Sequence, residues 1–281
     1  MDWRLIPEQM LDGVSSMAAD EVAAETVAEG GPATVRLYRW FPSAVTLGYG
    51  NDADVVDWEY CEEWSIDVTR RPTGGGAIYH DSAGDVAYSI IAPSEGFPGD
   101  VTESYRELLD PVIDAFDRFG VDVTFADADR AAVWSPACYL RELDPAHDLV
   151  GPDGRKIAGN AQYRTREAIV QHGSLSFDVE SQTHLDCFDD PPVSPAEFEA
   201  HVCGALEFVE YDQVVETGAG AMAGYDLQRS RFVAALEDAL GEWADAEEGE
   251  WTEDETARAA DIADGKYRAD AWIEDRVDPL D

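Results

Sequence analysis

Two arginines followed by three glycines form the strongest local signal in the sequence. The segment from Arg70 to Asp81 reads RRPTGGGAIYHD. Glycines have no side chain, so the backbone N–H groups of Gly74–Gly76 can approach a ligand closely. The two arginines beside them supply fixed positive charge. The pattern predicts a site for a phosphate or a carboxylate, with a simple hairpin turn as the alternative; no GKS or GKT follows, which excludes a Walker A loop.

Lysine is almost absent from this chain. Of its 19 Lys and Arg residues, only Lys156 and Lys266 are lysines. A lysine that persists where arginine has replaced nearly all others is expected to need a compact ammonium group, which arginine does not mimic. Lys156, in the segment GRKIAGNAQ, is therefore a candidate catalytic residue. A surface lysine retained by chance is the alternative.

Cysteine and histidine supply the other reactive side chains. Cys138, in SPACYL, is either a nucleophile or a small apolar loop residue. A nearby Lys156 ammonium would stabilise its thiolate. His80 and His172 are candidate bases, although strand histidines more often have structural roles. Neither a zinc site nor a disulfide framework is expected, because no CxxC spacing occurs and the other histidines, His147, His184 and His201, lack metal-ligand spacing.

These residues must be positioned by a mixture of strands and helices. Apolar periodicity predicts a first helix capped by Ser15 or Ser16 and ended by Gly30–Gly31. The segment 126–148 has no clear period and is expected to be a loop. The other expected strands are TVRLYRW, AVTLGYG, SIDVTR, 85–92, VDVTF and a hairpin of 156–164 with 168–177, and the other expected helices are 57–64, 102–119, 194–206, 227–240 and 252–264.

The charge of the chain is unusual. Sixty Asp and Glu residues against 19 Lys and Arg residues give a formal net charge of −41, which disfavours nucleic acid as a partner. An acidic, lysine-poor chain is typical of a halophile, with an acidic surface for a basic partner as the alternative. The N-terminus lacks a signal-peptide pattern, and no apolar stretch is long enough to span a membrane. We therefore expect a soluble, cytoplasmic protein.

Three segments together, RRPTGGGAIYHD, KIAGNAQ and QHGSL, resemble the lipoate-protein ligase A family and its octanoyltransferase relatives. The resemblance extends from SSMAADEVAAE near the N-terminus to KYRADAW near the C-terminus. It implies an α+β fold, with a mixed sheet flanked by helices as in biotin and lipoate ligases. We expect this catalytic domain at residues 1–240 and an acidic helical segment at 241–281.

The resemblance also implies roles for individual residues. Lys156 would contact the activated acyl group, and Arg71 would hold the phosphate of an acyl adenylate. Physical reasoning agrees, since a charge-assisted hydrogen bond from Lys156 would stabilise an oxyanion. The ligand-binding loop would comprise Arg71, Gly74, Gly75, Gly76, Ala77, Ile78 and Tyr79, and the further pocket candidates are Arg70, His80, Asn160 and His172.

Two activities are compatible with this resemblance. A lipoate-protein ligase would use ATP and Mg²⁺ to make lipoyl-AMP and then modify a lysine of a lipoyl domain. An octanoyltransferase of the LipM type would need no ATP, because it would carry octanoate from an acyl carrier protein as a thioester on Cys138. GGG followed by Ala is the more ligase-like form of the loop, whereas the transferases tend to read GGR, so the sequence slightly favours the ligase.

The expected partners are the lipoyl domains of 2-oxoacid dehydrogenase E2 subunits and the glycine-cleavage H protein. A separate subunit could supply an accessory domain that many ligases carry and this chain is too short to contain. A non-catalytic lipoate or lipoyl-domain binder is a weaker alternative, because such a protein would have lost Lys156.

Overall fold

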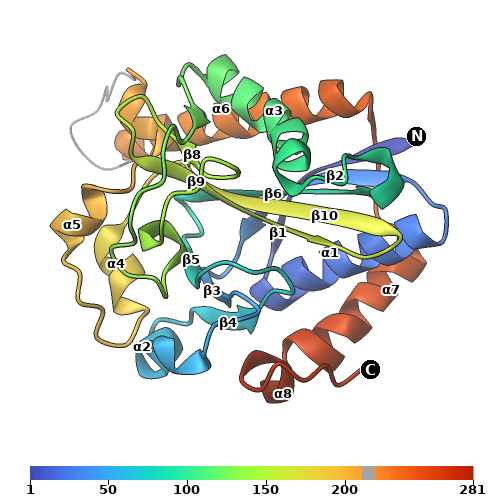
Figure 1. Cartoon of the computed structure of the whole chain (residues 1–281), viewed down its shortest axis with the longest axis horizontal. Helices are drawn as coiled ribbons and strands as arrows, with labels where there is room; N and C mark the ends of the chain where they lie inside the picture. The colour runs from blue at the N-terminus through green and yellow to red at the C-terminus, as the bar shows by residue number, and fades with distance from the viewer. Residues whose placement is uncertain (211–218, 281) are drawn as a thin grey trace.

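A mixed sheet forms the centre of the molecule. The computed structural model describes residues 1–210 and 219–280. Within these residues, eight strands form one sheet in the order β11-β1-β2-β6-β10-β9-β8-β7, and three strands form a second sheet in the order β4-β3-β5 (Figure 1). The strands are β1 (Trp3–Leu11), β2 (Ala33–Trp40), β3 (Ala44–Leu47), β4 (Asp67–Arg70), β5 (Ile78–His80), β6 (Asp85–Pro93), β7 (Thr124–Phe125), β8 (Leu149–Val150), β9 (Lys156–Arg164), β10 (Ala168–Ser176) and β11 (Glu247–Glu248).

Helices cover both faces of the large sheet, as expected for the α+β fold. Helices α3 and α6 pack together over one face, and α1 with α7 lies on the other, where the small sheet also sits (Figure 1). The helices are α1 (Gly13–Ala28), α2 (Trp58–Glu63), α3 (Val101–Phe119), α4 (Ser181–Asp186), α5 (Pro195–Glu199), α6 (Ala219–Ala244), α7 (Glu253–Ile262) and α8 (Asp270–Ile273).

The two central strands, β6 and β10, have one mainly apolar face and one face on which polar and apolar side chains are mixed. Successive side chains of a strand point to opposite sides of the sheet. Tyr88 and Ile90 on β6 therefore join the core beneath α3 and α6 with Leu175 on β10. The alternate positions include Ser89 and His172, which are directly opposite each other in the antiparallel pairing. The face toward α1 thus buries polar side chains beside the apolar Ile91 and Val170, and this is where the candidate site lies.

Several expected elements are confirmed. The hairpin of β9 and β10 has its turn at 165–167, and Gly120 ends α3 in the left-handed region with φ of 103°. Thr252 and Glu255 form a capping box at the start of α7. The loop expected over 126–148 is irregular except for a short 3₁₀ turn, Cys138–Leu140.

Other expectations were wrong. The cap of α1 is Asp12, because its carboxylate accepts the N–H of Ser15 at 2.8 Å, and neither Ser15 nor Ser16 serves as the cap. The helix expected over 194–206 is limited to α5, followed by a separate 3₁₀ turn at Ala205–Phe208. Strand β1 was not expected, since it is defined by pairing with β2 and β11, which are distant in sequence.

The acidic C-terminal segment packs against the rest of the molecule. The expected boundary at 240/241 falls inside α6. Arg4 bonds to Glu255 of α7, and Lys266 lies 2.9 Å from Glu21 of α1 and 2.6 Å from Asp278. The division at residue 240 remains a prediction. None of the helices in the described part of the chain has the length and apolar content needed to cross a bilayer.

Candidate functional site

Arg71 shapes the glycine loop from inside. The loop leaves β4 and returns as β5, and both strands pair with β3. The buried Arg71 guanidinium donates to the Thr46 carbonyl oxygen (2.9 Å) and to the carbonyl oxygens of Gly74 (2.8 Å) and Gly76 (2.7 Å). Burial lowers the pKa of Arg71 to about 10. One terminal nitrogen of Arg71 thus holds the loop and the other holds β3, which differs from the phosphate contact expected for this residue.

The neighbouring Arg70 points away from the site. Its fully buried guanidinium donates to the carbonyl oxygens of Gly48 (2.8 Å) and Asn51 (2.8 Å) and, in the C-terminal segment, of Ile273 (2.8 Å). The Trp272 indole N–H donates in return to the Arg70 carbonyl oxygen. Arg70 was expected near the pocket; it instead joins β4 to α8, because successive residues at the end of a strand face opposite sides.

The glycine loop and the Cys138 loop are bonded directly to each other. The Ala77 N–H donates to the Pro136 carbonyl oxygen, and the Cys138 N–H donates to the Ala77 carbonyl oxygen, both at 2.7 Å. A Cβ atom at Gly76 would lie 2.6 Å from the Cys138 backbone nitrogen. Position 76 therefore requires glycine, and the two motifs act as one structural unit.

Lys156 reaches this unit from the start of β9. Its buried Nζ atom donates to the Cys138 carbonyl oxygen at 3.1 Å and forms an ion pair with Asp148 Oδ1 at 2.6 Å. Burial opposes the charge of the ammonium, but the negative charges of Cys138 and Asp148 outweigh it and raise the pKa of Lys156. Burial likewise opposes ionisation of Asp148, and Lys156 overcomes it, lowering the pKa of Asp148 to about 2. Lys156 therefore stays a cation and Asp148 an anion across the neutral range.

Cys138 lies where two cavities meet. The first, of about 430 Å³, is mainly apolar and includes Met17, Trp40 and Ile78 in its lining. The second, of about 550 Å³, is polar, and Lys156 contributes to its wall. Both cavities are lined by Gly75, Cys138 and Asn160. A half-buried thiol thus has an apolar chamber on one side and a charged one on the other.

One backbone position on β9 makes room for the sulfur. A Cβ atom at Gly159 would lie 3.0 Å from Cys138 Sγ and 4.0 Å from the Lys156 side chain. The contact with the sulfur would be tighter than a relaxed packing distance, whereas the contact with Lys156 would be an ordinary one. The glycine in KIAGNAQ therefore gives the thiol its place beside Lys156.

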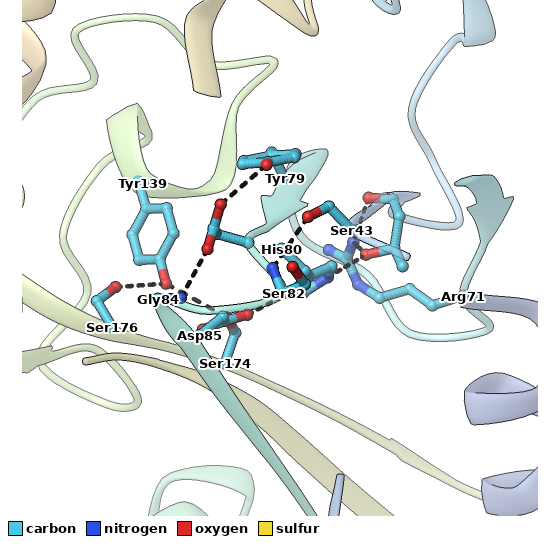
Figure 2. A network of polar contacts seen from close by, with 12 residues as sticks. Ser43, Arg71, Tyr79, His80, Ser82, Gly84, Asp85, Tyr139, Ser174 and Ser176 are labelled. Carbon is cyan, nitrogen blue, oxygen red and sulfur yellow. Dashed lines mark hydrogen bonds and ion pairs between the residues drawn. The ribbon is translucent and has the colours of Figure 1, made fainter. Parts of the chain in front are cut away.

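His80 and His172 line the apolar cavity, yet protein groups occupy their ring nitrogens. His80 Nδ1 contacts Asp85 at 2.8 Å and Nε2 contacts Thr46 at 2.9 Å, and burial lowers the pKa of His80. Figure 2 shows the His80–Asp85 contact extended to Ser174, whose hydroxyl donates to Asp85 at 2.7 Å. This arrangement favours a structural role for His80.

His172 sits in a similar network on the same face of the sheet. Its Nδ1 contacts Asp20 of α1 at 3.1 Å, and its Nε2 contacts Thr73 of the glycine loop at 2.7 Å. Asp20 is also paired with Arg36 at 2.7 Å. The network connects α1, β2 and the loop, so His172 helps to position the loop.

The remaining expected residues divide between the site and its surroundings. Asn160 lies at the cavities and bonds to Tyr88 (2.9 Å) and to the His147 carbonyl oxygen (3.0 Å). Ala77 contributes its backbone. Tyr79 turns away from the apolar cavity, and its hydroxyl donates to Asp81, as Figure 2 shows.

Sequence reasoning missed the carboxylates that hold the cationic and imidazole groups. Asp148, Asp85 and Asp20 are each nearly fully buried, in a chain with 60 acidic residues. In so acidic a chain, an Asp or Glu at a given position does not by itself indicate a buried carboxylate at the site. Only Asp85, which directly precedes an apolar strand, and Asp20, inside an apolar helix, stood in a sequence context suggestive of burial.

Sequence comparisons identify relatives that cover from two thirds to nearly all of the chain. The model of the lipoyl protein ligase A/B catalytic domain matches residues 12–210. The octanoyltransferase LipM of Kyrpidia tusciae is 31% identical over 285 aligned positions, covering 96% of this chain and 97% of the relative. The octanoyltransferase LipM of Halalkalibacterium halodurans is 32% identical, covering 67% of this chain and 71% of the relative.

Solved structures share the fold. A lipoate-protein ligase A bound with ATP superposes with a TM-score of 0.73 at 22% identity, covering 97% of this chain and 98% of the other. A bipartite lipoate protein ligase from Thermoplasma acidophilum, described with its E2 lipoyl domain, gives a TM-score of 0.74 at 22% identity, covering 99% of this chain and 98% of the other. At this identity the likeness establishes the α+β fold and no more.

Proposed function

Because this chain belongs to the lipoyl protein ligase A/B catalytic-domain family, we propose that it is an octanoyltransferase working through a thioester on Cys138. The chain is an enzyme of the lipoyl ligase and transferase family. The donor would be an octanoyl acyl carrier protein, and the acceptor a lysine of a lipoyl domain. The observation that carries the proposal is the position of Cys138, between an apolar chamber and the Lys156 ammonium.

The first step forms an acyl-enzyme. The Cys138 thiolate attacks the thioester carbonyl of the donor, a C–S bond to Cys138 forms, and the C–S bond to the carrier breaks. The carrier thiolate leaves and takes up a proton. The apolar cavity would hold the octanoyl chain, since Met17, Trp40 and Ile78 offer it a dry surface.

The second step transfers the acyl group to nitrogen. The target amine attacks the Cys138 thioester, a C–N bond forms, and Cys138 leaves as a thiolate. An ammonium has three N–H donors. In the described part of the chain, two acceptors contact Lys156 Nζ, namely Asp148 and the Cys138 carbonyl. The third N–H is the natural donor to the oxyanion that develops in both steps.

The ligase remains the second candidate, and the comparisons reverse the slight preference for it. The ligase-like form of the glycine loop favoured ATP-dependent activation of lipoate with Mg²⁺. Against it, the full-length curated relatives at about 30% identity are named octanoyltransferases. Arg71, expected to hold the adenylate phosphate, spends its terminal donors on Thr46 and the loop carbonyls. A non-catalytic binder is the least favoured, since Lys156 and Cys138 are adjacent.

Partners and cellular setting are also part of the proposal. The Thermoplasma ligase described with an E2 lipoyl domain supports lipoyl domains as acceptors, with the glycine-cleavage H protein as another. Its bipartite build supports a separate accessory subunit as a possible requirement. The net charge of −41 supports a halophile's cytoplasm as the working environment.

The proposal is tested by intact mass of an apo lipoyl domain in concentrated KCl. One reaction contains octanoyl carrier protein without ATP, and the other contains lipoate with Mg-ATP. We expect an octanoyl adduct in the first reaction and a transient octanoyl adduct on the enzyme. Cys138→Ser should abolish both adducts, whereas Cys61→Ala, which removes a buried thiol outside both cavities, should retain them.

Modification only with lipoate and ATP, unaffected by Cys138→Ser, would establish the ligase in place of the transferase. Modification in neither reaction, with a domain that a known transferase modifies, would contradict both enzymatic candidates for the isolated chain.

A further inference from the structure

The polar cavity beside Cys138 is lined by a histidine to which the two-step scheme assigns no role. His147 and Asn160 both line this cavity, and the Asn160 side chain donates to the His147 carbonyl oxygen at 3.0 Å. About one third of the His147 side chain is exposed. Unlike the buried His80 and His172, it is partly exposed to solvent, and it lines a cavity that Cys138 also lines.

A short series of contacts joins His147 to the reacting centre. Lys156 Nζ contacts both the Cys138 carbonyl oxygen (3.1 Å) and Asp148 Oδ1 (2.6 Å). The same Asp148 oxygen lies 3.6 Å from His147 Nδ1, and Asp144 lies 3.7 Å from His147 Nε2. Within the described residues, the buried Nδ1 atom has no hydrogen-bond partner. The ring therefore lies between two carboxylates, and its Nδ1 atom has no hydrogen bond to either of them.

The chemistry of the second step requires a base at this place. A lysine amine is protonated at neutral pH and must lose a proton before or as it attacks. An imidazole ordinarily titrates near neutral pH and a carboxylate several pH units lower, so an imidazole is the better acceptor of this proton. Asp144 and Glu142, which line the same cavity, would attract the incoming ammonium.

We propose that His147 is the general base that accepts the proton of the target lysine as it attacks the Cys138 thioester. His147 takes the first proton of the target ammonium and releases it to solvent from its exposed imidazole. The C–N bond forms, the C–S bond breaks, and the second proton passes from the nitrogen to the departing Cys138 thiolate. Lys156 stays an ammonium throughout and stabilises the oxyanion and the departing thiolate. This inference rests on the proposed function and adds a residue to its second step only.

The pH dependence of the step follows from the groups around the ring. Protonated His147 accepts no proton, so transfer should slow in acidic buffer. The titratable and charged groups that face His147 or line the same cavity are Tyr105, Cys138, Arg141, Glu142, Asp144, Asp148 and Lys156.

The experiment separates the two steps. The enzyme is loaded from octanoyl carrier protein, the donor is removed, and an apo lipoyl domain or hydroxylamine is added to the acyl-enzyme at several pH values. Intact mass follows the loss of the acyl group. His147→Gln should load at the wild-type rate and transfer to the lipoyl domain at least tenfold more slowly at pH 7. It should react normally with hydroxylamine, which is neutral at that pH and needs no base.

The wild-type rate should rise from acidic pH and then level off, whereas the rate of the variant should keep rising across the range as the lysine deprotonates unaided. His201→Gln is the matched control, because in the part of the chain that the structure describes its exposed ring has one hydrogen bond, to the Glu197 carbonyl oxygen.

Each contrary outcome has a distinct meaning. Normal transfer by His147→Gln from a fully loaded enzyme would overturn the inference and leave the proposed function intact. Equal slowing with the lipoyl domain and hydroxylamine would also overturn it, since that pattern reports damage to the thioester site. Failure of the wild-type enzyme to load would overturn the proposed function and this inference together.

Discussion

The ion pair of Lys156 and Asp148 places a full positive charge inside the molecule. Both side chains are almost completely buried and lie 2.6 Å apart. Two such charges cost several kcal/mol each to desolvate, and their attraction recovers this only while both remain. Under the proposed function, the pair therefore serves the reaction more than it serves stability, since an apolar pair of similar size would hold the fold as well.

Removing one partner of the Lys156–Asp148 pair should show how far their attraction offsets the cost of desolvating both charges. Asp148→Asn leaves the ammonium unpaired and should lower the free energy of unfolding by roughly 3–5 kcal/mol. Lys156→Met combined with Asp148→Asn should recover most of that loss while remaining inactive in acyl transfer. Urea unfolding in constant KCl measures both. Additive losses in the double variant would show that the pair is not energetically coupled.

The same pair sets a pH dependence. The pKa of Asp148 falls from 3.8 to about 2 on folding, so the folded state favours its ionised form. This stabilisation is fully present above pH 4 and is lost as the pH falls toward 2. Its size is about 2 kcal/mol, from the shift in pKa. The stability difference between the wild type and the Asp148→Asn, Lys156→Met double variant should shift by that amount over this range.

At the scale of elements, the site is assembled from β4–β5, the Cys138 loop, and β9 with β10. Strand register does most of the positioning, because alternate residues of β10 place His172 and Ser174 toward α1 and Leu175 toward α3. Gly159 on β9 then leaves space for the sulfur. A change at Gly159 thus tests the assembly without touching a reactive group.

Gly159→Ala should fold normally and load poorly. The new methyl group would lie 3.0 Å from Cys138 Sγ, and the sulfur, at the end of a short side chain, would have to move. We expect acyl-enzyme formation to slow at least tenfold and the urea midpoint to change little. Gly99→Ala is the matched control, since nothing lies within 4 Å of its added methyl group. Wild-type loading by Gly159→Ala would mean that this spacing is not critical.

The sequence predicted the elements with local signals and missed those defined by distant contacts. The β9–β10 hairpin, α3 and the α7 capping box follow from periodicity and caps within a few residues. Strand β1 has no such signal, since its definition comes from pairing with β2 and β11. Motifs identified Lys156, Cys138 and Gly75. They did not reveal that Arg70 faces the C-terminal segment, which depends on where Ile273 packs some 200 residues later.

At the scale of the whole molecule, the net negative charge opposes the compact folded state. A formal net charge of −41 on 281 residues makes the compact state repel itself in dilute salt. Neither lysine lies on the acidic surface. Lys156 and Lys266 are both buried, and each is paired with carboxylates. The lysines that persist are therefore those with interior partners, which fits the reasoning that singled out Lys156.

At low concentrations, salt should stabilise this molecule mainly by screening the repulsion between its surface carboxylates. The Debye length is about 10 Å at 0.1 M salt and about 3 Å at 1 M, so most of the surface repulsion should vanish within that range. We expect the melting temperature to rise steeply between 0.1 and about 1 M KCl and more gently above it. Differential scanning calorimetry at a fixed pH near 7 measures the curve.

Two controls separate screening from salting-out. Tetramethylammonium chloride at equal ionic strength should reproduce the steep part, because screening depends on ionic strength and not on the cation, whereas sucrose should not. If the melting temperature rises linearly from the lowest salt upward, with no change of slope near 1 M, salt acts by strengthening apolar burial and not by screening. In that case the acidic surface would serve solubility alone, and the free energy of unfolding in dilute buffer should already be typical of a neutral protein of this size.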